Sequence, residues 1–176
     1  MSWRGEDGGI AAAKAGHDAV MTPTDYCYFD YYQASPKTEP VAIGGFTTLK
    51  KVFEYEPVPA EISETESRHI LGAQGNLWTE YIPVPRHAEY MSVPRMCALA
   101  EVVWSPRGGR SWEDFQKRLD THFRRLYGMG VNFSQGSFHV DIATELRDGV
   151  PHLVLLGAED QMRHTIPKLG CNVDVK

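Results

Sequence analysis

The chain is 176 residues long, with 42% apolar and 23% charged residues, which is ordinary for a globular protein and argues against disorder. Its formal net charge is −5 and its basic residues do not cluster strongly, which argues against a nucleic-acid-binding protein. No run of about 18 apolar residues occurs, so the sequence predicts no transmembrane helix.

The first half of the chain alternates between patterns typical of strands and of helices. The predicted elements are a strand end in residues 1–5, a helix in 8–15, a strand in 17–22, a weak helix in 47–55 and a second strand in 68–76. We expect Gly16 to end the first helix and Pro23 to end the first strand. The aromatic run YCYFDYY (26–32) follows the first strand, and LWTEY (77–81) follows the second.

Two longer amphipathic helices are predicted in the second half of the chain, over residues 86–104 and 112–127. Pro94 should kink or divide the first of them. Ser111 is a good N-cap for the second helix, with Asp114 three residues further on. Residues 136–156 alternate as β-strands do, which predicts a separate β module.

Three cysteines, Cys27, Cys97 and Cys171, lie far apart in the sequence. Their odd number and wide spacing build neither a disulfide framework nor a zinc site. Cys97 lies in a run of small residues (CALAEVVW), where we expect a buried and unreactive thiol. We therefore expect neither a metal ion nor an organic cofactor.

This order of elements predicts an α/β fold with parallel strands. In a parallel α/β barrel, the functional side chains lie at the C-terminal ends of the strands. The aromatic and polar pairs at such ends are Trp3 with Arg4, Tyr28 with Asp30, and Trp78 with Glu80. Aromatic faces cover the apolar face of a sugar ring, and carboxylates accept hydrogen bonds from its hydroxyls. A carbohydrate site is therefore the functional hypothesis, and packing at the barrel rim is the alternative for any single aromatic residue.

Four motifs together resemble glycoside hydrolase family 20, the β-N-acetylhexosaminidases: SWRG (2–5), YCYFDYYQ (26–33), HILGAQGNLWTEYI (69–82) and PRMCALAEVVWSP (94–106). The resemblance covers residues 1–133. It implies that this stretch is the C-terminal portion, about three eighths, of a (β/α)₈ TIM barrel, with strand seven in residues 17–22 and strand eight in 70–76. Residues 134–176 resemble the beginning of a small, incomplete C-terminal β domain.

The resemblance also implies a substrate-assisted retaining mechanism, in which the 2-acetamido oxygen of the sugar attacks the anomeric carbon. In the family a Glu is the general acid/base and the adjacent Asp orients the acetamido group. Carried over by motif, Tyr28 is the tyrosine that hydrogen-bonds the acetamido oxygen, and Asp30 is a sugar-binding carboxylate. Trp78 walls the pocket beneath the sugar, Glu80 binds its O4/O6 side, and Trp3 is another wall of the acetamido pocket.

The sequence departs from the family pattern at the catalytic pair, because its 176 residues contain neither an Asp-Glu dipeptide nor an HxGGDE-like motif. A general acid contributes about 10²–10⁴ in rate, so we expect little or no hydrolysis by this chain alone. We interpret the chain as a segment cut from, or started within, a longer enzyme. The alternatives are a non-catalytic carbohydrate-binding module and an interaction fragment that acts only when complemented by an N-terminal barrel segment.

An incomplete barrel leaves unpaired strand edges, which invite association. We therefore expect self-association, or folding that depends on complementation by the rest of the barrel. The expected partner is a glycan ending in N-acetylhexosamine, with no nucleic acid and no membrane segment. The resemblance implies that full-length relatives are exported to a bacterial periplasm, a cell surface or the medium. It leaves open the location of this chain and its preference between GlcNAc and GalNAc.

Overall fold

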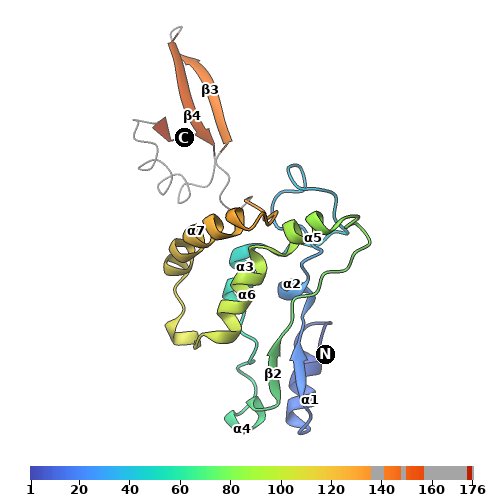
Figure 1. Ribbon diagram of the computed structural model, residues 1–176. Helices are drawn as coiled ribbons and strands as arrows, with labels where there is room; N and C mark the ends of the chain where they lie inside the picture. The colour runs from blue at the N-terminus through green and yellow to red at the C-terminus, as the bar shows by residue number, and fades with distance from the viewer. Residues whose placement is uncertain (136–140, 148–149, 157–173, 176) are drawn as a thin grey trace. The chain divides into compact units, whose positions relative to one another are not determined.

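The computed structural model describes residues 1–135, 141–147, 150–156 and 174–175 (Figure 1). The chain divides into two compact units, Met1–Ser134 and Gln135–Lys176. The elements of the first unit are α1 (Asp7–Lys14), β1 (Ala19–Met21), α2 (Thr24–Cys27), α3 (Leu49–Glu54), α4 (Glu64–Ser67), β2 (Ile70–Ala73), α5 (Pro85–Ser92), α6 (Arg95–Trp104), the 3₁₀ helix η1 (Arg107–Gly109) and α7 (Trp112–Gly128).

The first unit has an α/β fold built on parallel strand pairing. β1 pairs with β2 in parallel, from Ala19 opposite Ile70 to Met21 opposite Ala73 (Figure 1). On its other side β1 pairs with Ser2, whose N–H donates to the Val20 carbonyl oxygen at 3.0 Å. Parallel strands bring their C-terminal ends to one edge, so the segments that follow these three stretches meet there.

The pairing resumes after a one-turn interruption by α2. Tyr28 pairs in parallel with Asn76. The Phe29 N–H donates to the Asn76 carbonyl oxygen, and the Asn76 N–H donates to the Cys27 carbonyl oxygen, both at 2.7 Å. The segment that carries Tyr28 is therefore tied by backbone hydrogen bonds to the segment that follows β2.

The helices cover these strands with their apolar faces. Met21 of β1 and Cys27 of α2 pack with Tyr55 in one buried cluster, and the rings of Tyr26 and Tyr55 stack at 4.7 Å between centroids. α3 contacts α6, and both helices have buried apolar side chains: Leu49, Val52 and Phe53 in α3, and Ala98, Leu99 and Val102 in α6. No helix within the described ranges is long and apolar enough to span a membrane.

Proline divides the stretch 86–104 into two helices. α5 ends before Val93, which is extended with φ −104° and ψ 129°, and α6 begins after Pro94. A proline lacks the N–H of a helical hydrogen bond, and its ring disfavours the helical conformation of the residue before it. The prediction that Pro94 kinks or divides this stretch is therefore confirmed, as a division.

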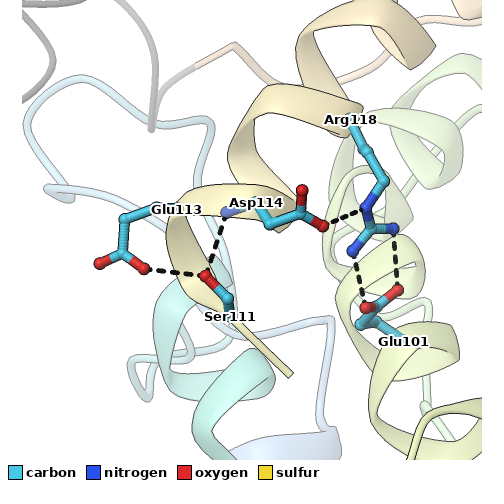
Figure 2. Close-up of polar contacts among 5 residues, drawn as sticks. All are labelled: Glu101, Ser111, Glu113, Asp114 and Arg118. Carbon is cyan, nitrogen blue, oxygen red and sulfur yellow. Dashed lines mark hydrogen bonds and ion pairs between the residues drawn. The ribbon is translucent and has the colours of Figure 1, made fainter. Parts of the chain in front are cut away.

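The contact between α6 and α7 includes an ion-pair cluster (Figure 2). The Arg118 guanidinium donates two hydrogen bonds to the Glu101 carboxylate, at 2.7 and 3.0 Å, and one to Asp114 at 2.8 Å. The Ser111 hydroxyl accepts the Asp114 N–H at 3.3 Å and donates to Glu113 at 3.0 Å, which caps α7 as predicted. Glu101 and then Asp114 raise the pKa of Arg118, so the cation is held at all working pH values.

The second unit contains a short sheet. β3 (Asp141–Arg147) pairs antiparallel with β4 (Val150–Leu156), and β5 (Asp174–Val175) pairs with β4 in parallel. The alternating pattern predicted over 136–156 is thus a hairpin where the structure describes it, and residues 136–140 and 148–149 of that range lie outside the described residues. Cys171 also lies outside them. That a β domain begins at residue 134 stays a prediction.

Candidate functional site

The five residues singled out in the sequence all follow stretches of the parallel pairing. Trp3 follows Ser2, Tyr28 and Asp30 follow β1 after the turn of α2, and Trp78 and Glu80 follow β2. Because the strands are parallel, all five backbone positions lie toward the same edge of the sheet.

Asp30 is the most buried of the five, with 5% of its surface exposed. Burial raises the pKa of its carboxyl group, and the nearby charge of Glu80 raises it further. The backbone N–H groups of Asp30 and Trp78, and then the Arg95 cation, act in the opposite direction and lower this pKa. The carboxyl group of Asp30 thus lies against the backbone of Trp78 and within electrostatic reach of Glu80, so these three residues form one cluster.

One oxygen of that carboxyl group, Oδ1, is buried and has no hydrogen-bond partner among the described residues. The amide Nδ2 of Asn76 is likewise buried and unpartnered there, while the Asn76 Oδ1 accepts a hydrogen bond from Gln74 at 2.7 Å. Buried polar atoms are normally satisfied, and each exception in a native fold calls for an explanation. A hydroxyl group is the kind of donor that the Asp30 oxygen lacks.

Two aromatic residues, Tyr28 and Trp78, lie on the segments that carry this polar cluster. Tyr28 is half-buried, and its ring lies 5.6 Å from the ring of Tyr31 between centroids. Trp78 leaves 53% of its surface exposed. An exposed indole two residues from Glu80, on a backbone that bonds the Asp30 carboxyl group, suits a ligand with one apolar face and a polar rim.

The backbone of Trp3 is hydrogen-bonded to the segment that precedes Tyr28 and Asp30. Its carbonyl oxygen accepts the Thr24 N–H at 3.1 Å, which fixes it beside the start of α2. The interaction that the described structure gives its indole is with Arg4, whose guanidinium carbon lies 4.7 Å from the ring centroid. Trp3 therefore shares the strand edge with the cluster of Tyr28, Asp30, Trp78 and Glu80.

Sequence reasoning missed Arg95. This arginine begins α6, is completely buried, and donates to the backbone carbonyl oxygens on either side of Asp30, those of Phe29 and Tyr31. The available signal was a charged residue inside an otherwise apolar helical stretch (VPRMCALA), but such a residue is usually exposed.

A groove of about 730 Å³ lies elsewhere, between α6 and α7, and contains none of the predicted site residues. Trp104, Phe115, Arg118 and His122 are among its lining residues. Apolar side chains and cations line it, with Glu101 already paired to Arg118. The cluster of Tyr28, Asp30, Trp78 and Glu80 remains the candidate site. In the part of the chain that the structure describes, it alone combines free hydrogen-bond acceptors, an exposed indole and a tyrosine hydroxyl.

No three His, Cys, Asp or Glu side chains gather into a possible metal-ion site in the part of the chain that the structure describes. Burial raises the pKa of the Cys27 thiol to about 12 and raises that of Cys97 as well. These two thiols are therefore protonated and poor nucleophiles at neutral pH.

Comparison with known proteins assigns this arrangement to a family. A family model described as "Glycosyl hydrolase family 20, catalytic domain" matches residues 1–107. The chain belongs to glycoside hydrolase family 20. This family 20 chain is 47% identical over 134 residues to a β-hexosaminidase of Porphyromonas gingivalis, an alignment that covers 76% of the chain and 17% of the relative. A β-hexosaminidase of Akkermansia muciniphila is 38% identical over 112 residues, which is 62% of the chain and 22% of that relative.

Solved structures agree with this assignment. A family 20 exo-β-N-acetylglucosaminidase of Vibrio harveyi, solved in complex with N-acetylglucosamine, superposes with a TM-score of 0.67 at 33% identity. The superposition covers 77% of the family 20 chain and 21% of the Vibrio protein. The chain thus spans about one fifth of the length of these relatives.

Proposed function

We propose that this chain supplies the sugar-binding edge of a β-N-acetylhexosaminidase, a glycosidase that removes terminal, non-reducing N-acetylhexosamine from glycans. In this proposal residues 1–133 are the last three eighths or so of a (β/α)₈ catalytic barrel and residues 134–176 begin a C-terminal β domain. The observation that carries the proposal is the gathering of Asp30, Trp78 and Glu80 next to Tyr28 at the C-terminal edge of parallel strands.

Each side chain has a role that fits its chemistry. The exposed indole of Trp78 stacks on the C–H face of the pyranose ring. The carboxylates of Glu80 and Asp30 accept hydrogen bonds from sugar hydroxyls, with Glu80 on the O4/O6 side. The Tyr28 hydroxyl donates to the acetamido oxygen and so orients it toward the anomeric carbon. Trp3 adds a further wall to the acetamido pocket.

The reaction in this proposal uses the substrate as its own nucleophile. The acetamido oxygen forms a bond to the anomeric carbon while the bond from that carbon to the leaving oxygen breaks. The leaving oxygen must take up a proton, and the Asp-Glu pair that the family uses for this step does not occur in these 176 residues. Because a general acid contributes about 10²–10⁴ in rate, the chain alone binds the sugar and turns it over slowly or not at all.

The test is a titration of the 176-residue chain with N-acetylglucosamine, followed by calorimetry or amide chemical shifts. We expect saturable binding that weakens about tenfold or more in Trp78→Ala, because the stacking face is lost. Trp104→Ala is the matched control, since this indole is 87% exposed and lies outside the cluster, and it should keep the wild-type affinity. Absence of binding to the wild type, or equal losses in the two variants, would refute the proposed site.

Release of a chromophore from an aryl N-acetyl-β-glucosaminide is measured beside the titration. The proposal expects a rate equal to the enzyme-free blank. Turnover that is reduced in Tyr28→Phe would mean that another carboxylate of this chain donates the proton, and the role given to the missing pair would be wrong.

A non-catalytic carbohydrate-binding module is the second candidate, and the absence of the Asp-Glu pair is the observation that favours it. Both candidates expect sugar binding through Trp78. They differ when a segment with the family's HxGGDE-like motif is added: a barrel segment gains turnover by complementation, and a binding module does not.

A further inference from the structure

Arg95 is the most unusual charge in the described part of the chain, because none of its surface is exposed. A buried cation is costly unless hydrogen bonds replace its water. Its Nη1 donates to the carbonyl oxygens of Tyr31, at 3.0 Å, and Thr47, at 2.9 Å, and its Nη2 donates to those of Phe29 and Met91. The Nε also donates to Met91, at 3.2 Å, so all three guanidinium nitrogens are engaged.

These acceptors belong to three segments that are distant in the sequence. Two of them, Phe29 and Tyr31, flank Asp30 on either side, so one rigid fork holds both neighbours of the buried carboxylate. The guanidinium carbon also lies 5.1 Å from the centroid of the buried Phe29 ring. A planar guanidinium with five N–H groups can hold several carbonyl oxygens in fixed directions, whereas an ammonium on a flexible stem cannot.

The hydrogen bonds of Arg95 in the described structure all end on backbone carbonyl oxygens, and none ends on a carboxylate. Its charge is therefore balanced at longer range. Glu39, Asp30 and Tyr90 favour the cation, while burial opposes it and lowers the pKa of Arg95 to about 9. The cation in turn favours the ionised form of Asp30. Arg95 thus acts on the site both through the backbone and through its charge.

We propose that Arg95 is a positioning residue for sugar binding: its guanidinium fixes the backbone on both sides of Asp30 and so sets the geometry of the Tyr28–Asp30 segment against Trp78. The proposal rests on the proposed function for the identity of the ligand. The claim that Arg95 orders this segment does not depend on the ligand and can be tested without a sugar.

The test compares Arg95→Lys, which keeps the charge and loses the fork, with Arg95→Met, which keeps an unbranched side chain and loses the charge. Leu119→Ala is the control, because it removes a buried side chain of α7 and lowers stability away from the site. All are examined as the 176-residue chain, at a temperature where circular dichroism shows them folded.

Amide hydrogen exchange is the first readout and needs no ligand. The Phe29 N–H reports on the site segment through its bond to Asn76, and the Ala19 N–H reports on β1 through its 2.7 Å bond to the His69 carbonyl oxygen. We expect each Arg95 variant to speed exchange at Phe29 about tenfold or more beyond any change at Ala19, because local opening is cheaper once the fork is lost. Leu119→Ala should affect the two amides alike.

The Kd for N-acetylglucosamine is the second readout. We expect it to rise about tenfold in Arg95→Lys and to stay at the wild-type value in Leu119→Ala. Equal acceleration at Phe29 and Ala19 in both Arg95 variants, or a wild-type Kd in Arg95→Lys, would overturn the positioning role and leave Arg95 as a general packing residue. If the wild type binds no sugar, the proposed function fails, and the exchange at Phe29 still decides whether Arg95 orders the segment.

Discussion

Gly75 lies where the strand β2 continues toward the site, and it approaches the ring of Phe29 more closely than any other residue type could. A Cβ at this position would lie 2.6 Å from the Phe29 Cε2 and 3.1 Å from two further ring atoms. Ordinary carbon contacts are about 3.5–4.0 Å, so the ring would have to move by roughly 1 Å. Phe29 is completely buried and packs on the Arg95 guanidinium, which leaves the ring little freedom to do so.

We therefore expect Gly75→Ala to destabilise the fold. Overpacking of this kind costs about 1–3 kcal/mol, and the lower chain entropy of alanine in the unfolded state returns about 0.4–1 kcal/mol. A net loss of about 1–2 kcal/mol lowers the Tm of a domain of this size by roughly 3–10 °C. Thermal unfolding followed by far-ultraviolet circular dichroism measures it directly.

The matched control is Gly128→Ala, at the last residue of α7, where an added Cβ would meet no atom within 4 Å. Alanine favours a helix over glycine by up to about 1 kcal/mol, so this variant should melt at or above the wild-type temperature. A Gly75→Ala chain that melts with the wild type would refute the reasoning, since it would mean that Phe29 is free to move and that the site segment is loosely held.

Two further predictions concern charge. Burial raises the pKa of Asp30, so the folded chain holds this proton more tightly than the unfolded chain does. The resulting stabilisation is complete below the ordinary carboxyl pKa and is lost as the pH rises through the raised pKa. The Tm of Asp30→Asn relative to that of the wild type should therefore increase between pH 4 and pH 7. Thermal melts of both proteins at the two pH values measure this difference in Tm. A difference that is the same at both pH values would contradict the prediction. Glu101→Gln removes one of the two carboxylate partners of Arg118, whose side chain is 51% exposed, and should cost about 0.5–1 kcal/mol at low salt. Urea unfolding should show that this cost nearly disappears in 1 M NaCl, where the Debye length is about 3 Å, whereas a cost independent of salt would point to lost packing instead.

The helix boundaries that depend on a single residue were predicted correctly from the sequence. Ser111 caps α7 through its hydroxyl, and Pro94 separates α5 from α6, because each effect involves only neighbouring residues. The predicted strand 17–22 was too long: the His17 N–H bonds to the Ala12 carbonyl oxygen at the end of α1, and so β1 begins only at Ala19.

Two short α-helices were not predicted, for different reasons. α2 begins directly after Pro23, which had been interpreted only as the end of a strand although proline is also common at the start of a helix. α4 begins with a capping box in which Ser63 and Glu66 exchange hydrogen bonds, a pattern that the spacing of these two residues in the sequence already indicates. Proline is therefore ambiguous between the end of a strand and the start of a helix, whereas the capping box is specific to a helix start.

The burial of Arg95 could not be predicted in this way, because it depends on carbonyl oxygens from residues 29, 31 and 47 that meet only in the folded chain. Once they meet, residues from two other motifs support the segment around Tyr28 and Asp30. The missing side chain of Gly75 admits the Phe29 ring, Asn76 pairs with the backbone around Tyr28, and Arg95 holds the carbonyl oxygens beside Asp30. The residues proposed to touch the sugar are therefore held by other residues, Gly75, Asn76 and Arg95, that are not proposed to touch it. A substitution at Gly75 or Arg95 should consequently impair sugar binding without removing a sugar contact, whereas Trp78→Ala removes a contact and leaves the supporting backbone in place.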